Sequence, residues 1–279
     1  MPGTLFIVAT PLGNLEDITF RAVRILTSVG LIAAEDTRRT RNLLTHFGLK
    51  TRLISYREQN HHRIMPRILS ALHDNEDVAL VSDAGTPGVS DPGILLVQES
   101  VAAGIKIVPV PGPSAVATSL SVAGLPADRY FFGGFLPVKT IARRKTLDGM
   151  KNLPWTLVFF EAPHRLAETL VDLKSVLGDR PAVVCRELTK INEELCRGRL
   201  DQLAEYWSNS LDQVKGEITI VVAGADPSEK ALLAPDEVRD LVRGDQRPIR
   251  AIVADLQGRT SLTRSELYRL IVEITRPDN

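Results

Sequence analysis

The chain has 279 residues, of which 44% are apolar and 24% charged, and its 34 basic side chains balance 34 acidic ones. This composition excludes a disordered chain, and no apolar run approaches the roughly 18 residues of a membrane-spanning helix. Because the amino-terminal apolar run is too short for a signal peptide and the two cysteines, Cys185 and Cys196, lack disulfide or metal-ligand spacing, we expect a cytoplasmic protein with reduced thiols and no metal.

Short β-branched strands alternate with amphipathic segments through the first 124 residues. Strands are predicted at residues 4–9, 31–35, 51–55, 77–82 and 105–110. This alternation predicts βαβ units around a mostly parallel sheet. Thr19 is placed to cap a helix that stops at Gly30, and a segment that starts at Ser114 stops at Gly124.

The pattern restarts after residue 124. Strands are predicted at 130–135, 156–161, 181–187, 193–199 and 216–224, with helices over 143–151, 164–177 and 200–208. Some of these strands follow one another with little helix between them, which predicts a mixed sheet. Three short helices near 236–243, 248–256 and 265–274 follow, the last with a capping box from Thr263 to Glu266. We therefore expect α/β domains at 1–124 and 125–225 and a helical appendage at 226–279.

Elaborate loops follow four of the predicted strands in the first domain, starting at Thr10, Ala34, Ser82 and Val110. None contains G-x-G-x-x-G, a Walker motif or G-x-S-x-G, which argues against a dehydrogenase, an NTPase and a serine hydrolase. Because the carboxyl ends of parallel strands line the binding crevice, we expect these loops to meet around a ligand. The loop in "LVSDAGTPGVSDPG" combines three glycines, which permit close backbone approach, with two prolines, which stiffen it.

Basic residues gather in two segments of this neutral chain. The segment from Arg21 to Arg63 contains nine basic and three acidic residues, and the segment from Lys139 to Lys151 contains five basic residues and one aspartate. Such clusters occur on solvated helix faces and also where phosphates bind, so the charge pattern leaves both interpretations open.

Seven strings in order, "VATPLGNLEDIT", "IAAEDTRRT", "LVSDAGTPGVSDPG", "VPVPGPSA", "GLPADRYFFGGFLP", "FFEAPHR" and "RELTK", resemble the bacterial 16S ribosomal RNA ribose 2′-O-methyltransferase I family. That family belongs to the tetrapyrrole-methylase superfamily, the class III fold of S-adenosylmethionine-dependent methyltransferases. The resemblance implies two α/β domains with S-adenosylmethionine in the cleft between them, commonly in a homodimer. It also implies methylation of a cytidine ribose in the decoding region of 16S ribosomal RNA, as free RNA or within the small ribosomal subunit.

The resemblance also assigns candidate site residues. For the cofactor these are Asp83, Ala84, Gly85, Thr86, Pro87, Ser114, Ala115, Phe160 and Leu188. Thr86 stands where the tetrapyrrole enzymes have an aspartate, so a carboxylate contact is not expected there. For RNA phosphates the candidates come from the distribution of basic residues and not from the resemblance: Arg38, Arg39, Arg41, Arg143, Arg144, Lys145 and Arg165.

A base that removes the proton of the ribose hydroxyl is the hardest residue to assign. Glu35, Asp36 and Glu161 are candidates; we favour Asp36, which follows a buried strand and precedes the arginines, with Glu161 second. Two other functions remain open: a methylase of a tetrapyrrole or other small molecule, and a non-catalytic RNA-binding module. Binding of S-adenosylmethionine would distinguish the last from both enzymes.

Overall fold

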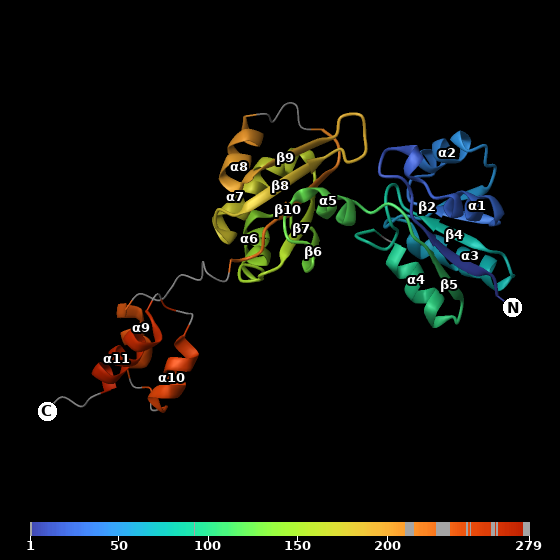
Figure 1. Ribbon diagram of the computed structural model, residues 1–279. Coiled ribbons are helices and arrows are strands. Elements are labelled where there is room, and N and C mark those ends of the chain that lie inside the picture. The colour runs from blue at the N-terminus through green and yellow to red at the C-terminus, as the bar shows by residue number, and fades with distance from the viewer. Residues whose placement is uncertain are drawn as a thin grey trace. The chain divides into compact units, whose positions relative to one another are not determined.

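The computed structural model describes residues 2–91, 93–209, 215–226, 235–243, 245, 247–257, 260 and 262–275. The chain divides into two compact units, Met1–Ala223 and Gly224–Asn279. The first unit contains two five-stranded sheets and the second contains three helices. Figure 1 shows the strands and helices of the first sheet in blue and teal, those of the second in green to orange, and the three helices in red. None of the described helices combines the length and the apolar character needed to cross a membrane.

The first sheet is entirely parallel. Its strand order is β3 (Arg52–Ser55), β2 (Leu31–Ala34), β4 (Val78–Val81), β1 (Thr4–Val8) and β5 (Lys106–Val110). One apolar cluster joins it to α3 (His61–His73) and α4 (Gly93–Ala102), and another joins it to α1 (Phe20–Ser28) and α2 (Thr37–His46). Because helices cover both faces, β2 and β4 are buried along their whole length, as parallel strands usually are. The predicted parallel sheet is confirmed.

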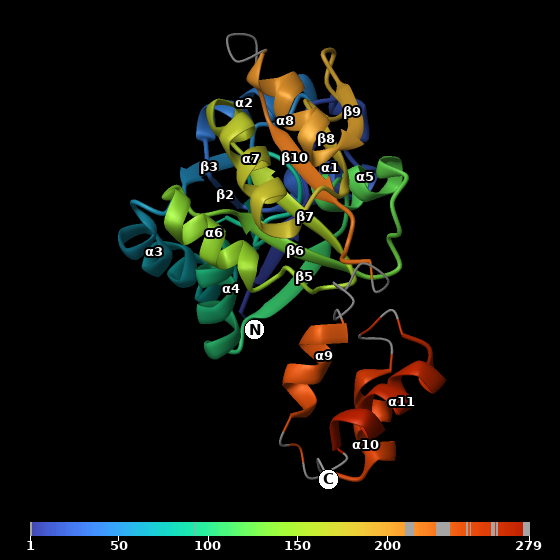
Figure 2. The same ribbon diagram turned by 90° about the vertical axis from the view of Figure 1, so that its left-hand side faces the viewer.

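The second sheet is mixed, as predicted. Its order is β6 (Tyr130–Phe135), β7 (Thr156–Glu161), β10 (Ile218–Val222), β8 (Pro181–Arg186) and β9 (Glu194–Arg199). Only β6 and β7 are parallel; the other pairs are antiparallel. One face packs against α6 (Thr140–Asp148), α7 (Leu166–Leu177) and α8 (Leu200–Ser208), which Figure 2 shows in front of the strands.

Helix α5 (Ala115–Ala123) follows the last strand of the first sheet but belongs to the core of the second. Its residues Val116 and Leu120 pack against Val158 and Val183. Two short 3-10 helices, η1 (Leu15–Asp17) and η2 (Pro163–Arg165), lie in the loops after β1 and β7. A domain boundary after residue 124 stays a prediction.

The second unit consists of α9 (Pro235–Val242), α10 (Ile249–Leu256) and α11 (Arg264–Thr275) around an apolar cluster that includes Val238, Ile252 and Leu267. The predicted capping box is present: the backbone N–H of Thr263 donates to Glu266 Oε2 (2.7 Å), and the N–H of Glu266 donates to Thr263 Oγ1 (3.3 Å).

Candidate functional site

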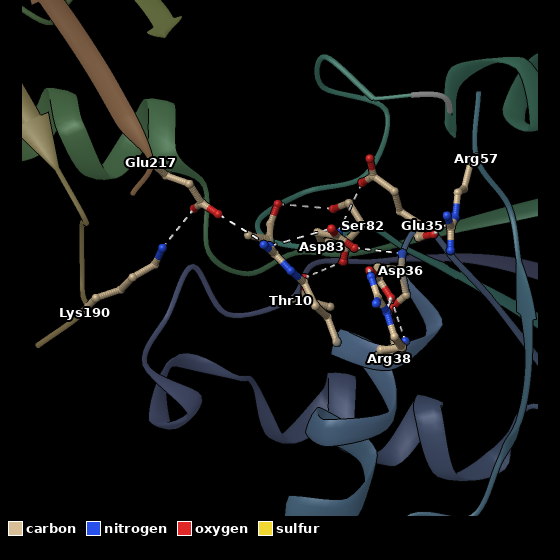
Figure 3. Close-up of polar contacts among 12 residues, drawn as sticks. Thr10, Glu35, Asp36, Arg38, Arg57, Ser82, Asp83, Lys190 and Glu217 are labelled. Atoms are coloured by element: carbon tan, nitrogen blue, oxygen red, sulfur yellow. Dashed lines mark hydrogen bonds and ion pairs between the residues drawn. The ribbon is translucent and has the colours of Figure 1, made fainter. Parts of the chain in front are cut away.

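The loops after β1, β4 and β5 are tied together at the carboxyl edge of the first sheet. The N–H of Thr10 donates to the carbonyl of Gly85 (2.9 Å), and the N–H of Gly85 donates back to Thr10 (3.0 Å). The Thr10 hydroxyl donates to the carbonyl of Ser82 (3.2 Å), and that of Thr86 donates to the carbonyl of Pro113 (3.1 Å). Figure 3 shows Thr10 directly beneath Ser82 and Asp83. The convergence predicted for these loops is confirmed.

Gly85 is the residue on which this turn depends. Its φ is +79°, a conformation that residues with a Cβ rarely adopt. A Cβ added at Gly85 would lie 3.3 Å from Leu12 Cδ2. Because residue 85 is a glycine, the backbone of the turn can pack closely against the loop after β1.

A central cavity of about 410 Å³ opens between this turn and the second sheet. The first sheet contributes Leu12, Asp83 and Ala84, and the second contributes Phe160–Pro163 and Gly216–Thr219. Its volume lies within the range of about 300–1,000 Å³ that is common for small-molecule sites. Of the predicted cofactor residues, Asp83, Ala84, Ala115 and Phe160 line it. Gly85, Thr86, Pro87 and Ser114 are not among its lining residues. Leu188 is not either, because its side chain packs in the apolar cluster with residues of α5.

An outer cavity of about 790 Å³ adjoins the central one. It is lined by Arg57 and His61 and by residues from the loops after β2 and β4. Four residues line both cavities: Glu35, Asp83, Ser90 and Asp91. The two cavities therefore share a wall, and ligands in them would meet there.

Arg39, predicted to contact RNA, lies instead at the wall of the central cavity. Its guanidinium is 3.7 Å from a carboxylate oxygen of Asp83 and 3.6 Å from one of Glu217. Glu217 also pairs with Lys190 (3.4 Å), so a chain of charges runs from α2 to the loop after β8 (Figure 3). The sequence does not predict this network, because Arg39 and Glu217 are 178 residues apart along the chain.

Asp36, the favoured base, is the N-cap of α2. Its Oδ1 accepts from the backbone N–H of Arg38 (2.8 Å), and its Oδ2 pairs with the Arg38 guanidinium (2.9 Å). These hydrogen bonds and the charge of Arg38 lower the pKa of Asp36 well below its ordinary value. A carboxylate with so low a pKa is a weak proton acceptor, which argues against the role predicted for it.

Glu161, the second candidate, is buried and fully engaged. Its Oε2 accepts from the Thr169 hydroxyl (2.6 Å), its Oε1 accepts from the Ala162 N–H (2.7 Å), and the Arg165 guanidinium is 3.4 Å away. These contacts assign Glu161 to holding the chain as it leaves β7. The side chain of Arg165, 12% exposed, also donates to the carbonyls of Leu136 and Pro137 and has little surface left for RNA.

The prediction that Arg143 binds RNA is wrong. Its side chain is 0% exposed and pairs at 2.6 Å with both Asp172 and Glu168 on α7. Arg144 also pairs with Asp172 (2.6 Å) but is half exposed, and Lys145 is exposed. On α2, Arg38 and Arg41 are exposed. Of the residues predicted to contact RNA, the exposed ones are therefore Arg38, Arg39 and Arg41 on α2 and Arg144 and Lys145 on α6.

Three comparisons with known proteins bear on this site. The model of the tetrapyrrole (corrin/porphyrin) methylase family matches residues 4–204. A ribosomal RNA small subunit methyltransferase I of Pseudomonas aeruginosa is 45% identical over 271 residues, which cover 96% of each chain. The protein of the same name from Xylella fastidiosa strain Temecula1 is 52% identical over 231 residues, 82% of this chain and 85% of that one.

Solved structures agree on the fold. A cobalt precorrin-4 methyltransferase of cobalamin biosynthesis superposes with a TM-score of 0.60 at 16% identity and covers 79% of this chain and 94% of its own. The uroporphyrin-III C-methyltransferase from Thermus thermophilus, complexed with S-adenosyl homocysteine, superposes with a TM-score of 0.57 at 18% identity, over 79% of this chain and 97% of its own. At these identities the likeness establishes the fold alone.

Proposed function

The chain belongs to the ribosomal RNA small subunit methyltransferase I family and has the tetrapyrrole methylase fold, and from this we propose that it transfers a methyl group from S-adenosylmethionine to the 2′-hydroxyl of a cytidine ribose in 16S ribosomal RNA. The observation that carries the proposal is the pair of adjoining cavities. The central cavity suits a small cationic ligand, and the outer cavity is open to a larger substrate.

The central cavity fits S-adenosylmethionine in volume and in charge. Apart from Glu161, whose side chain is buried and paired, the charged residues among the described lining are four carboxylates and one arginine: Glu35, Asp83, Asp91, Glu217 and Arg39. An excess of carboxylates favours a ligand that carries positive charge, as the sulfonium and the amino group of S-adenosylmethionine do. The backbone at Ala84, in the turn that Gly85 makes possible, and the ring of Phe160 would hold this ligand, which supplies the methyl group when bound.

The outer cavity is suited to the sugar and base of one nucleotide rather than to its phosphates. Its lining includes the carboxylates of Glu35, Asp36 and Asp91, which would repel a phosphate placed inside. Arg38, exposed on α2, pairs with the lining residue Asp36 and would bind a phosphate outside the cavity. A nucleotide can leave its phosphate outside the cavity while its sugar and base enter. A porphyrinoid carries its carboxylates on the macrocycle, so they would enter with it and be repelled by the carboxylates of the lining. The lining therefore favours RNA over a porphyrinoid.

In such a site the protein acts mainly by alignment. The hydroxyl oxygen, the methyl carbon and the sulfur have to lie in line, and orientation of this kind contributes about 7–11 kcal/mol in favourable cases. The shared wall of the two cavities is where this alignment would occur. A homodimer in the cytoplasm is a further part of the proposal, supported by the family alone.

The test is methyl incorporation from labelled S-adenosylmethionine into naked 16S RNA, 30S particles and uroporphyrinogen in parallel. Labelling of the RNA or the particles at a ribose oxygen is expected. Labelling of uroporphyrinogen alone would overturn the proposal. Calorimetry that detects no S-adenosylmethionine binding would instead indicate a non-catalytic RNA-binding module.

A further inference from the structure

The wall shared by the two cavities is where a proton acceptor for the ribose hydroxyl has to lie. An acceptor must come within about 2.6–3.2 Å of the hydroxyl, which itself has to face the methyl group. The titratable side chains that line both cavities are Glu35, Asp83 and Asp91. The choice is therefore among these three carboxylates.

Two of them are occupied in holding the backbone. Asp91 Oδ1 accepts from the N–H groups of Gly88 (2.7 Å) and Gly93 (2.8 Å), which shapes the loop that leads into α4. Asp83 Oδ1 accepts from the N–H of Asp36 (2.8 Å), and Asp83 Oδ2 faces the guanidinium of Arg39. Protonation of either carboxylate would weaken the loops that form the cavities.

Glu35 is far less engaged. Its Oε2 accepts one long hydrogen bond from the N–H of Asp83 (3.4 Å), and its Oε1 has no hydrogen bond to any described residue. The carboxyl groups of the neighbouring residues Glu35 and Asp36 point in opposite directions (Figure 3). Asp36 turns toward Arg38, whereas Glu35 extends toward the cavities.

The surroundings of Glu35 also suit proton transfer. Burial and the negative charges of Asp83 and Asp91 raise the pKa of Glu35, and the hydrogen bond from the Asp83 N–H and the charge of Arg39 only partly oppose them. The other titratable or charged residues that line the outer cavity are Asp36, which is neutralised by Arg38, and Arg57, Glu58 and His61. A carboxylate whose pKa is raised is a better general base than one at its ordinary value.

Arg57 lies next to Glu35 at the outer cavity. Its Nε donates to the backbone carbonyl of Glu35 (3.0 Å) and to the hydroxyl of Ser55 (3.1 Å). The terminal guanidinium nitrogens make no ion pair with the described residues, so they are available to a phosphate next to the ribose. This arrangement would place a nucleotide with its phosphate outward and its sugar toward Glu35.

We propose that the carboxylate of Glu35 accepts the proton of the 2′-hydroxyl during methyl transfer, an inference that rests on the proposed function. As the O–C bond forms, the S–C bond breaks and its electron pair returns to sulfur. The hydroxyl proton passes to Glu35. The products are the 2′-O-methyl ribose, S-adenosylhomocysteine and protonated Glu35, which returns the proton to solvent.

The test compares single-turnover rates of Glu35→Gln, Glu35→Asp and wild-type enzyme across the pH range, with Glu99→Gln, an exposed change on α4, as the matched control. We expect Glu35→Gln to lose about 10²-fold or more in rate while binding both substrates. The wild-type rate should fall as the pH drops through the pKa of Glu35, because the protonated acid accepts no proton. That dependence should vanish in Glu35→Gln. It should persist in Glu35→Asp at a lower rate, and in the control at the wild-type rate.

Near-wild-type rates for a folded Glu35→Gln enzyme, or an unchanged pH dependence, would overturn the role of Glu35 and leave the proposed function standing. If Glu35→Gln does not fold, the profile of Glu35→Asp decides: loss of its acid limb contradicts the proposal. Wild-type enzyme that methylates neither RNA nor 30S particles would overturn the proposed function itself, and this inference with it.

Discussion

The guanidinium of Arg39, on α2 of the first sheet, lies 3.6 Å from the carboxylate of Glu217, directly before β10 of the second. The pair joins the two sheets at the wall of the central cavity. Both Arg39 and Arg41 on this helix are exposed, but Arg39 is engaged with carboxylates, whereas Arg41 forms no ion pair with the described residues. The two arginines should behave differently toward RNA.

Arg41→Ala should reduce the slope of log K against log salt for RNA binding by about 0.7, the contribution of one phosphate contact on a single strand. Arg39→Ala should leave the slope unchanged because its guanidinium already has partners. Filter binding of 16S RNA over a range of salt concentrations measures both slopes. Equal reductions would indicate that Arg39 exchanges its carboxylates for a phosphate.

Gly85→Ala should lose affinity for S-adenosylmethionine by about tenfold or more, since the added Cβ presses on Leu12 and shifts the turn at the cavity wall. Gly104→Ala is the matched control: Gly104 also has a positive φ (+68°), but its Cβ would meet nothing within 4 Å. Both variants should lose about 1–2 kcal/mol of stability from backbone strain. Calorimetric titration and urea unfolding separate the two effects, and undiminished binding by Gly85→Ala would remove the turn from the site.

Arg143→Ala should lower the free energy of unfolding by an amount at the lower end of about 3–5 kcal/mol, because it leaves the buried carboxylate of Asp172 with Arg144 as its remaining ion-pair partner. RNA binding by the folded fraction should keep its salt dependence. Replacing both partners, as Arg143→Met with Asp172→Leu, should restore much of the lost stability. Urea unfolding measures all three proteins; a stable Arg143→Ala with weakened RNA binding would contradict the structural role.

Asp36→Ala should be less stable than wild type at neutral pH, because α2 loses its N-cap and the partner of Arg38. Asp36→Asn should be closer to wild type, since asparagine also caps helices. The folded-state pKa of Asp36 is lowered, so its stabilising effect is present above the unfolded value of about 4 and is lost as the pH falls toward the folded value. Unfolding free energies of wild type and Asp36→Ala should therefore converge in acid; a constant difference down to low pH would contradict this.

Local patterns predicted the strands, the character of each sheet and the loops that meet at the site. Gly85 was predictable because a loop of glycines and prolines directly after a buried strand has few other uses. Asp36 could have been recognised as an N-cap, since it precedes a helical run. An aspartate directly before a helical run, however, is compatible with a catalytic role as well as with an N-cap, so the pattern alone does not separate the two roles of Asp36.

Long-range partners explain what the sequence could not predict. The run "ARRK" around Arg143 resembles a solvated helix face, and its carboxylate partner Asp172 lies 29 residues further along the chain. Likewise, nothing local to Glu35 distinguishes it from Asp36. The direction of each side chain follows from the way the chain leaves β2 and enters α2.

Helix α5 has a consequence for anyone who wishes to express the halves of this protein separately. A fragment that ends at residue 124 would contain α5 but not the strands of the second sheet against which α5 packs. The apolar side chains of Val116 and Leu120 would then be exposed to solvent, so we expect the fragment to aggregate. The complementary fragment, from residue 125 onward, would lack the helix that covers one face of its sheet. A cut in the segment Pro111–Ser114 keeps α5 with its own core and is the division point that the packing recommends.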